Sequence, residues 1–347
     1  MKEKELKRDF QNLWQGQKPF VFFRAPNTNS VCCFFQKDSQ LFKTFDFKIN
    51  GFLMGSFIME SKTAYIPSDH QKEYAFNPTL VSVQPFPLEE SKEEKQSFFD
   101  LVHRTKKAIH SGLLKKLVVS RKIKIKHNLN PFELFNNLLH LYPQAMVYFW
   151  HHPVAGTWMG ASPERLFGID EYGLKTMSLA GTLPFNSNEI YHWGAKEKLE
   201  QALVTQSIKK VLRDLFNEED IECSETYTKR AGNLVHLCND ISVNRANVSV
   251  ERMIKNLHPT PAVGGIPKQE GLDFIASHEK FDRQYYSGCM GDVDLLGECN
   301  LYVNLRCAQL KKESISLYVG AGITAESDAE QEWEETQNKA QTILQAL

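Results

Sequence analysis

Two pairs of glutamates with the same spacing are the first residues of this sequence that could do chemistry. Glu197 and Glu200 lie in GAKEKLEQALV, and Glu332 and Glu335 lie in EQEWEETQNK. On a helix, residues three apart share one face, so each segment can present two carboxylates in one direction. Four carboxylates brought together would repel one another, and a hard divalent cation such as Mg²⁺, which prefers oxygen ligands, would remove that repulsion. Taken alone, each pair is more typical of a solvated helix face.

Lys116 and Glu164 are candidates for acid–base chemistry. Lys116 begins KLVVSR, whose β-branched residues predict a strand. A lysine there commonly marks the solvent end of a strand, but a buried lysine favours its neutral form and could act as a general base. Glu164 lies in GASPERL, where Ser162 and Pro163 predict the cap and first residue of a helix. A first-turn carboxyl usually complements the helix dipole, whereas in an enclosed site it could stay protonated and act as a general acid.

Other chemically capable residues stand in unusual segments. Arg306 falls within NLYVNLRCAQL, which predicts a single strand, and a charge there calls for an anion or a carboxylate. The glycines of VGAGIT, Gly320 and Gly322, could let a ligand approach the backbone closely. Lys339 follows the second acidic pair at the spacing of ordinary surface pairing. His258 lies in HPTPAVGGIP, a Pro/Gly-rich loop through which no helix or strand is expected to continue.

The elements that must position these residues alternate between strands and helices. The charged segment 1–20 predicts an amphipathic helix, and short strands are predicted between residues 19 and 90. Further helices are predicted at about 93–111, ended by Gly112, in PFELFNNLLHLY, at about 193–216 and over the second acidic pair. Strands in hairpin-like succession with clustered helices predict an α+β fold with large antiparallel sheets.

Bulk composition limits the class of protein. The 347 residues are 42% hydrophobic and 24% charged, which is a globular composition long enough for one large domain or two. A net charge of −1 gives no reason to expect nucleic acid or an anionic membrane as partner. There is neither a membrane-length apolar run nor the apolar core of a signal peptide, so no membrane span and a cytoplasmic location are expected. The seven cysteines show no C-x-x-C spacing, which argues against a disulfide framework or a zinc site.

The order of the motifs resembles one known family. KLVVSR, GASPERL, LAGT, the E-x-x-E helix, HPTPAVGG, FDRQYYSG, NLRCA, VGAGI and EWEETQNK follow one another as in the chorismate-utilizing enzymes. That family includes isochorismate, salicylate, anthranilate and aminodeoxychorismate synthases. The resemblance begins at about residue 100. Residues 1–92 are therefore expected to be a variable part of the same domain, and residues 93–347 the chorismate-binding catalytic region.

The resemblance implies a fold, a cofactor and roles for individual residues. The fold would be a single α+β domain of two large antiparallel sheets packed as a sandwich, with helices around it. Mg²⁺ would be bound directly by Glu200 and Glu335, while Glu197 and Glu332 hold metal-bound waters. Substrate-binding positions are implied at Gly181, Thr182, His258, Tyr286, Arg306, Gly320 and Lys339. Among these, Arg306 and Tyr286 would hold the enolpyruvyl carboxylate, and His258 would lie near the substrate ring.

Among the residues that carry the resemblance, Lys116 discriminates best between the reactions of the family. In the isochorismate and salicylate branches, this lysine activates water for attack at C2 of the chorismate ring, and the residue matching Glu164 protonates the departing C4 hydroxyl. The anthranilate branch typically lacks this lysine, and the aminodeoxychorismate branch has a nucleophilic lysine where this chain has Ala180. The segment MES at 59–61 resembles the tryptophan-binding segment of anthranilate synthases, but the following KTAYIP does not continue that pattern.

We therefore expect a monomeric isochorismate synthase that acts on chorismate without an amidotransferase subunit. Menaquinone biosynthesis is the expected pathway, with siderophore biosynthesis left open. The nearest alternative is a salicylate synthase, which shares these catalytic residues and goes on to eliminate pyruvate. A non-catalytic ligand-binding homologue is the alternative from a different class.

Overall fold

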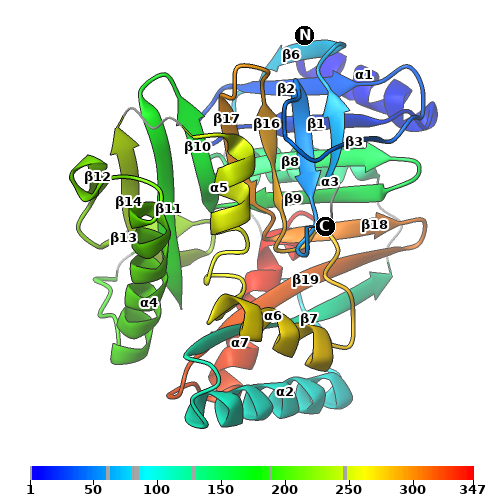
Figure 1. The fold of residues 1–347 in the computed structure, drawn as a ribbon. Coiled ribbons are helices and arrows are strands. Elements are labelled where there is room, and N and C mark those ends of the chain that lie inside the picture. The colour runs from blue at the N-terminus through cyan, green and yellow to red at the C-terminus, as the bar shows by residue number, and fades with distance from the viewer. Residues whose placement is uncertain are drawn as a thin grey trace.

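In the computed structural model the described residues are 2–59, 63–79, 81, 86–126, 130–187, 189–244 and 248–347. Their strands form two large antiparallel sheets with helices packed around them, which confirms the predicted α+β class (Figure 1). Glu60 and Ser61 of the MES segment lie outside the described residues. No helix in the described ranges is long and apolar enough to cross a membrane.

The first sheet has nine strands and forms the middle layer of the molecule. Both of its faces are covered, which is why β8 and β19 are buried along their whole lengths and have apolar sequences. Its spatial order is β15 (Gly265–Ile266), β7 (Lys116–Lys126), β19 (Ser314–Ile323), β18 (Cys307–Lys311), β9 (Gly156–Ser162), β8 (Met146–His152), β1 (Phe20–Arg24), β2 (Ser30–Phe35) and β6 (Gln71–Ala75).

The second sheet has ten strands, counting β13 (Tyr227–Ala231), which pairs with β14 beside the main path. The order along that path is β12 (Ile221–Cys223), β14 (Leu234–Asn244), β11 (Gly173–Pro184), β10 (Arg165–Asp170), β17 (Cys299–Val303), β16 (Cys289–Val293), β4 (Gly51–Gly55), β5 (Thr63–Pro67) and β3 (Phe42–Thr44). Apolar side chains from the facing strands of both sheets, such as Tyr148 and Met290, pack together as the core of the sandwich.

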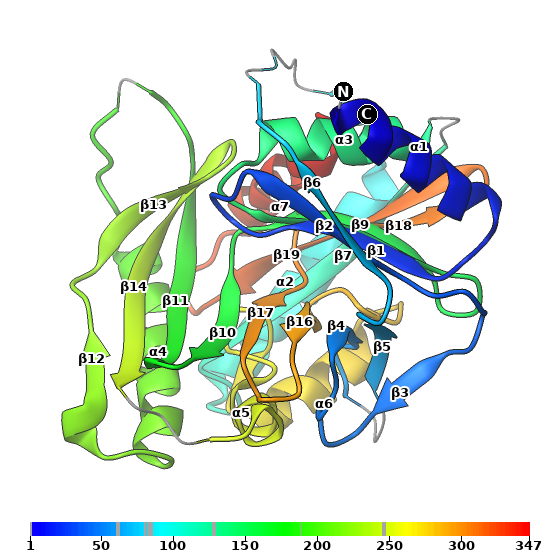
Figure 2. The same ribbon diagram turned by 90° about the horizontal axis from the view of Figure 1, so that it is seen from above.

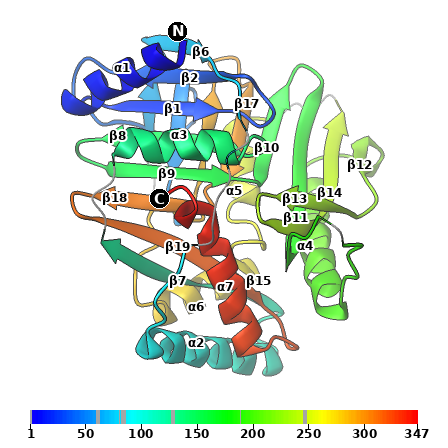
Figure 3. The same ribbon diagram turned by 180° about the vertical axis from the view of Figure 1, so that it is seen from behind.

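Helices cover the outer faces of both sheets. α1 (Lys2–Gln15), α3 (Pro131–Leu141) and α7 (Ala329–Leu344) pack on the first sheet, as seen from behind in Figure 3. α2 (Lys92–His110) packs against α7 and β7, and it ends just before Gly112, as predicted. α4 (Ala195–Arg213) and α5 (Val250–Leu257) cover the second sheet, and α6 (Lys268–His278) packs beside β15. A short 3₁₀ helix spans Glu218–Asp220.

The N-terminal part of the chain is built into both sheets. β1 lies between β2 and β8 in the first sheet, and β4 lies between β16 and β5 in the second. Figure 2 shows α1 and α3 on one side of β1 and β2, with β4, β5, β16 and β17 on the other. Residues before 92 therefore share a core with the rest of the chain, so the described residues form one body.

The structure corrects two sequence predictions where the chain passes from one sheet to the other. NLYVNLRCAQL is not one strand, because β17 ends at Val303 in the second sheet and β18 begins at Cys307 in the first, with Arg306 between them at φ +47°. GASPERL is not a helix start, because β9 ends at Ser162 in the first sheet and β10 begins at Arg165 in the second. The Ser162 hydroxyl donates to the Val303 carbonyl at 2.5 Å, so it ties the two crossings together instead of capping a helix.

Candidate active site

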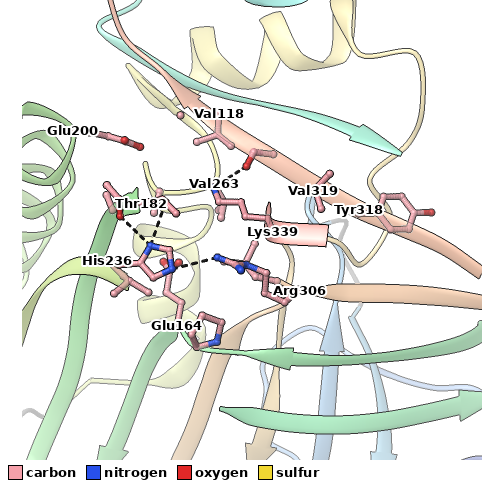
Figure 4. Close-up of a pocket in the computed structure, with 18 of the residues that line it drawn as sticks. Val118, Glu164, Thr182, Glu200, His236, Val263, Arg306, Tyr318, Val319 and Lys339 are labelled. Carbon is pink, nitrogen blue, oxygen red and sulfur yellow. Dashed lines mark hydrogen bonds between the residues drawn. The ribbon is translucent and has the colours of Figure 1, made fainter. Parts of the chain in front are cut away.

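A pocket beside these two crossings gathers most of the predicted site residues (Figure 4). The predicted residues that line it are Glu164, Gly181, Thr182, Glu200, Tyr286, Arg306, Gly320 and Lys339. Its volume is about 60 Å³, whereas pockets for small ligands usually hold about 300–1,000 Å³. Two of the residues that line it, Glu200 and Lys339, are paired with oppositely charged side chains, and the pocket must widen to hold a ligand of more than a few atoms.

Lys116 is the first residue of β7 and is fully buried, so the structure does not place it at a solvent end. Its Nζ lies 3.0 Å from Oε1 of Glu200, which reaches across from α4. Gly322 on the neighbouring strand β19 makes this approach possible, because a Cβ there would stand 2.0 Å from the same carboxylate oxygen. The close approach that was predicted for a ligand at this glycine is thus used by Glu200.

The second acidic pair is held by lysines. Glu332 is fully buried on α7, and its Oε1 lies 2.5 Å from Nζ of Lys196 on α4. Glu335 pairs with Lys339 at 2.6 Å, and Lys339 also donates to the carbonyl of Gly320 at 2.8 Å. Burial, together with the charge of Glu335, raises the pKa of Glu332 above its ordinary value. Burial opposes ionisation of Glu335 as well, but Lys339 and Lys196 lower its pKa overall.

Three of the four predicted metal ligands act electrostatically on the same cation, and one of them, Glu332, contacts it directly. The charges of Glu335, Glu332 and Glu200 all act on the ammonium group of Lys196 and raise its pKa, although its burial lowers it. Three carboxylates around one cationic group are the donor set that a hard divalent ion prefers, and they fit Mg²⁺ if the ion takes the place of Lys196. As the side chains stand, no group of three or more His, Cys, Asp or Glu residues is arranged as a metal site in the described part of the chain.

Glu197 is the acidic residue that the structure leaves apart from this group. It is in the first turn of α4, and its carboxylate folds back toward Gly194, the residue that precedes the helix. A glutamate at the third position of a helix commonly reaches back to the start in this way. Glu330 and Glu334 of α7 are exposed, and Glu330 pairs with Lys95 of α2.

Glu164 lies at the crossing from β9 to β10, with its backbone carbonyl accepting from the N–H of Val303 at 3.0 Å. Its side chain is buried and lines the pocket. Burial raises its pKa to about 7, although Lys116, Lys339 and Arg306 act to lower it. A carboxyl with a pKa near 7 holds its proton in a large fraction of molecules at neutral pH, which is what a general acid needs.

Arg306 has no carboxylate within ion-pair distance among the described residues, so its charge is open to an anionic ligand. It donates to Thr342 Oγ1 at 3.2 Å and to Nε2 of His236 at 3.3 Å. Nδ1 of His236 donates to the carbonyl of Gly181 at 2.9 Å, which leaves Nε2 as the acceptor for Arg306. Gly181 makes this possible at φ +68°, within a bulge of β11 between Ala180 and Thr182.

His236 is the pocket residue that the sequence analysis missed. Burial and the charge of Arg306 lower its pKa to about 3, so the imidazole is neutral at physiological pH and its Nε2 can accept from Arg306. The available signal was a histidine within NLVHLCND, which forms part of the buried strand β14. His258, which the resemblance implied, does not line this pocket and instead donates through Nε2 to the carbonyl of Phe57 at 2.9 Å.

Comparison with known proteins assigns the chain to a family. The model of the family described as "Chorismate binding enzyme" matches residues 58–347. Isochorismate synthase MenF of Escherichia coli is 30% identical over 290 residues, which are 78% of this chain and 67% of MenF. Isochorismate synthase EntC of Escherichia coli is 32% identical over 265 residues, which are 72% of this chain and 67% of EntC. The chain therefore belongs to the chorismate-binding enzyme family.

Two solved structures show the same fold. The structure of MenF from Escherichia coli has a TM-score of 0.80 at 22% identity, covering 94% of this chain and 89% of that chain. That of DhbC from Bacillus anthracis has a TM-score of 0.81 at 24% identity, covering 97% and 98%. The implied fold of two large antiparallel sheets with surrounding helices is confirmed by this likeness.

Proposed function

We propose that this protein is an isochorismate synthase, which converts chorismate to isochorismate. The observation that carries the proposal is a fully buried lysine, Lys116, whose Nζ lies 3.0 Å from Glu200, a residue that lines the same pocket as the high-pKa carboxyl of Glu164. This is a base and an acid on separate elements, as a substitution at two different ring carbons requires. The similarity to MenF and EntC, both named isochorismate synthases, supports the same reaction.

The two groups account for the protons of the reaction. Lys116 takes a proton from the water that attacks C2 of the ring. The ring double bond shifts, and the C4 hydroxyl leaves as water after it receives a proton from Glu164. One proton is taken up and one is given, so no redox cofactor is needed and the enzyme regains its starting state by proton exchange with solvent.

The remaining pocket residues bind and orient the substrate. Arg306, which pairs with no carboxylate among the described residues, and Tyr286 are proposed to hold the enolpyruvyl carboxylate, and a guanidinium suits that task because it can donate two parallel hydrogen bonds. His236 fixes the direction of Arg306. Lys339 and the backbone at Gly320 lie together at the opposite wall. Because the pocket is small in this structure, it must widen when the substrate binds.

We propose that Glu200, Glu332 and Glu335 hold Mg²⁺, with Glu200 and Glu335 as direct ligands. Glu197 is proposed to act through a metal-bound water, which requires its carboxylate to leave Gly194. When bound, the ion would neutralise the acidic helices and attract the ring carboxylate of chorismate.

A change of Glu335 tests the metal site. Glu335→Gln removes one negative donor while keeping the shape of the side chain. We expect the Mg²⁺ concentration for half-maximal activity to rise at least about tenfold, and calorimetric Mg²⁺ binding without substrate to weaken equally. Glu334→Gln, an exposed neighbour, is the matched control and should leave both unchanged. Identical Mg²⁺ curves for Glu335→Gln and the wild type would contradict the assignment.

A change of His236 tests the orientation of Arg306. His236→Leu removes the acceptor from Arg306 and the donor to Gly181. A hydrogen bond to a charged group contributes about 1.5–3 kcal/mol, so the KM for chorismate should rise roughly tenfold or more. We expect kcat to change less, because Lys116 and Glu164 stay in place. A reduced kcat at unchanged KM would show that His236 acts on the reacting atoms instead.

Product analysis separates the alternatives. Incubation with chorismate and Mg²⁺ should give isochorismate alone, whereas a salicylate synthase would also release pyruvate, and an anthranilate-type enzyme would need ammonia. No turnover in any of these conditions would leave only a ligand-binding homologue. We propose menaquinone biosynthesis as the pathway; of the two similar structures, MenF is described as menaquinone-specific and DhbC as 2,3-dihydroxybenzoate-specific, so neither pathway is favoured by the likeness. A gene-deletion strain should then lose menaquinone, and a strain that keeps it would contradict this pathway.

We further propose that the protein acts as a monomer in the cytoplasm, without an amidotransferase subunit. Light scattering of the purified protein, with and without chorismate, tests the oligomeric state, and a stable dimer would contradict it.

A further inference from the structure

His258 lines a second cavity, of about 450 Å³, that is separate from the catalytic pocket. The cavity lies between the end of β3, the segment after β4, helix α5 and the start of α6, all found in the lower part of Figure 2. Its size falls within the range of small-molecule sites. Nothing in the proposed reaction uses it.

The walls of this cavity are largely apolar. Phe47, Phe57 and Ile254 are buried within it, whereas Phe45 and Ile58 at its rim are 66% and 56% exposed. Large apolar side chains left in water beside a hollow are typical of a site that an apolar partner covers. The chemistry of the walls therefore suits an apolar ring.

One end of the cavity carries a positive charge without a counterion. Lys268 is partly buried, and its ammonium group donates to the backbone carbonyls of His258 and Lys255. No carboxylate pairs with Lys268 in the described ranges, whereas Lys255 at the rim already pairs with Glu251 at 2.6 Å. Burial lowers the pKa of Lys268. An anionic group placed beside this ammonium would supply the missing charge.

His258 offers an acceptor without a donor. Nε2 faces the carbonyl of Phe57, so this nitrogen must carry the proton, and Nδ1 then has a free lone pair. Nδ1 is buried and has no hydrogen-bond partner among the described residues. Burial lowers the pKa of His258 to about 4, so the ring stays neutral at physiological pH. A buried acceptor of this kind is normally satisfied, and a ligand hydroxyl would satisfy it once the cavity wall that covers Nδ1 moves aside on binding.

We propose that this cavity binds a small aromatic hydroxy acid. The ring packs between Phe57 and Ile58, the carboxylate meets the ammonium of Lys268, and the hydroxyl donates to Nδ1 of His258. The ring, the carboxylate and the hydroxyl of the ligand thus each contact a different feature of the cavity: the apolar wall, Lys268 and His258.

The cavity is coupled to the catalytic pocket through the chain. His258 begins the segment that runs to Ile266, and Val263 in its middle lines the catalytic pocket. The carbonyl of Gly264 accepts from Val118 at 2.8 Å, and the carbonyl of Ile266 accepts from the N–H of Lys115, next to Lys116, at 2.7 Å. A ligand that moves His258 therefore acts on the strand that carries the base. This coupling rests on the proposed function, whereas the binding site does not.

Calorimetry without chorismate tests the site, with 3-hydroxybenzoate as the probe. We expect saturable binding that is at least tenfold weaker for benzoate, which lacks the hydroxyl, and for 3-hydroxybenzyl alcohol, which lacks the carboxylate. Ile58→Glu should weaken binding at least tenfold, because it places a negative charge at the exposed rim without disturbing the core. Lys268→Met should do the same. Leu296→Glu, which charges an apolar side chain that is 90% exposed elsewhere, is the matched control and should bind normally.

Arg306→Ala distinguishes this cavity from the catalytic pocket and should leave binding of 3-hydroxybenzoate unchanged. Binding that Arg306→Ala abolishes and Ile58→Glu preserves would overturn the proposal, as would the absence of saturable binding to the wild type. Equal affinity for benzoate would overturn the role of His258. For the coupling, 3-hydroxybenzoate should change kcat/KM at least twofold in the wild type but not in Ile58→Glu. Unchanged turnover in the wild type under saturating probe would overturn the coupling.

Discussion

Lys116→Met is expected to lower kcat for isochorismate formation by about 10³-fold or more, because general base catalysis contributes about 10²–10⁴-fold. Methionine has nearly the length of lysine but cannot take a proton from water. Substrate binding should persist, since the arginine and the acidic helices are untouched. Initial rates from chromatographic separation of chorismate and isochorismate, with chorismate binding by calorimetry, measure the two effects separately.

The controls for this variant follow from the ion pair of Lys116. Removing the lysine leaves the carboxylate of Glu200 buried without its partner, and such a loss costs about 3–5 kcal/mol of stability. The double variant Lys116→Met with Glu200→Gln removes both charges and should recover much of that stability while staying inactive. Lys115→Met changes the exposed neighbour and should behave as the wild type. Full activity in a folded Lys116→Met protein would refute the role of this lysine as the base.

Glu164→Gln is expected to lower kcat to a similar extent as Lys116→Met. An amide of the same shape cannot donate the proton that the C4 hydroxyl needs. In the wild type, kcat/KM should fall as the pH rises through about 7, since that is where Glu164 loses its proton. Rates across pH, compared with those of Glu164→Gln, measure this. A rate that does not fall above pH 7 would contradict the assignment of Glu164 as the acid.

The same substitution should stabilise the protein at alkaline pH. The folded protein keeps the proton of Glu164 up to about pH 7, whereas the unfolded chain releases it near the ordinary value of 4.5. Folding is therefore progressively disfavoured as the pH rises between these values, and glutamine removes that penalty. Glu164→Gln should gain up to about 3 kcal/mol above pH 7 and little below pH 4.5, as read from denaturant unfolding. An equal effect at both pH values would show that Glu164 is already ionised.

Much of the fold was predictable because its elements are patterned locally. The helices α2, α3, α4 and α7 carry apolar faces, side chains cap the starts of α2, α3 and α7, Gly112 follows the end of α2, and the buried strands are apolar runs. The two crossings between sheets were not predictable, because Ser162 has the same local sequence signal whether its hydroxyl caps a helix or donates to the Val303 carbonyl. Arg306 was misplaced within one long strand for the same reason, since a strand that changes sheets keeps its alternation on both sides.

The site was predictable to the extent that spacing determines geometry. The E-x-x-E spacing places Glu332 and Glu335 on one face of α7, and both are held by lysines. It could not show that Glu197 folds back to Gly194 or that Lys196 reaches across to Glu332, because both depend on how α4 meets α7. Tertiary structure also determines which histidine, His236 or His258, lines the pocket. His236 reaches the pocket only because β14 pairs with the bulge of β11.

The origin of the new hydroxyl tests the central claim most directly. The protein is incubated with chorismate and Mg²⁺ in ¹⁸O-labelled water, and the product is analysed by mass spectrometry at low conversion. Attack of water activated by Lys116 predicts isochorismate with one solvent oxygen, located at C2, and no product from Lys116→Met. Isochorismate without the label, or salicylate with pyruvate as the accumulating product, would contradict the account.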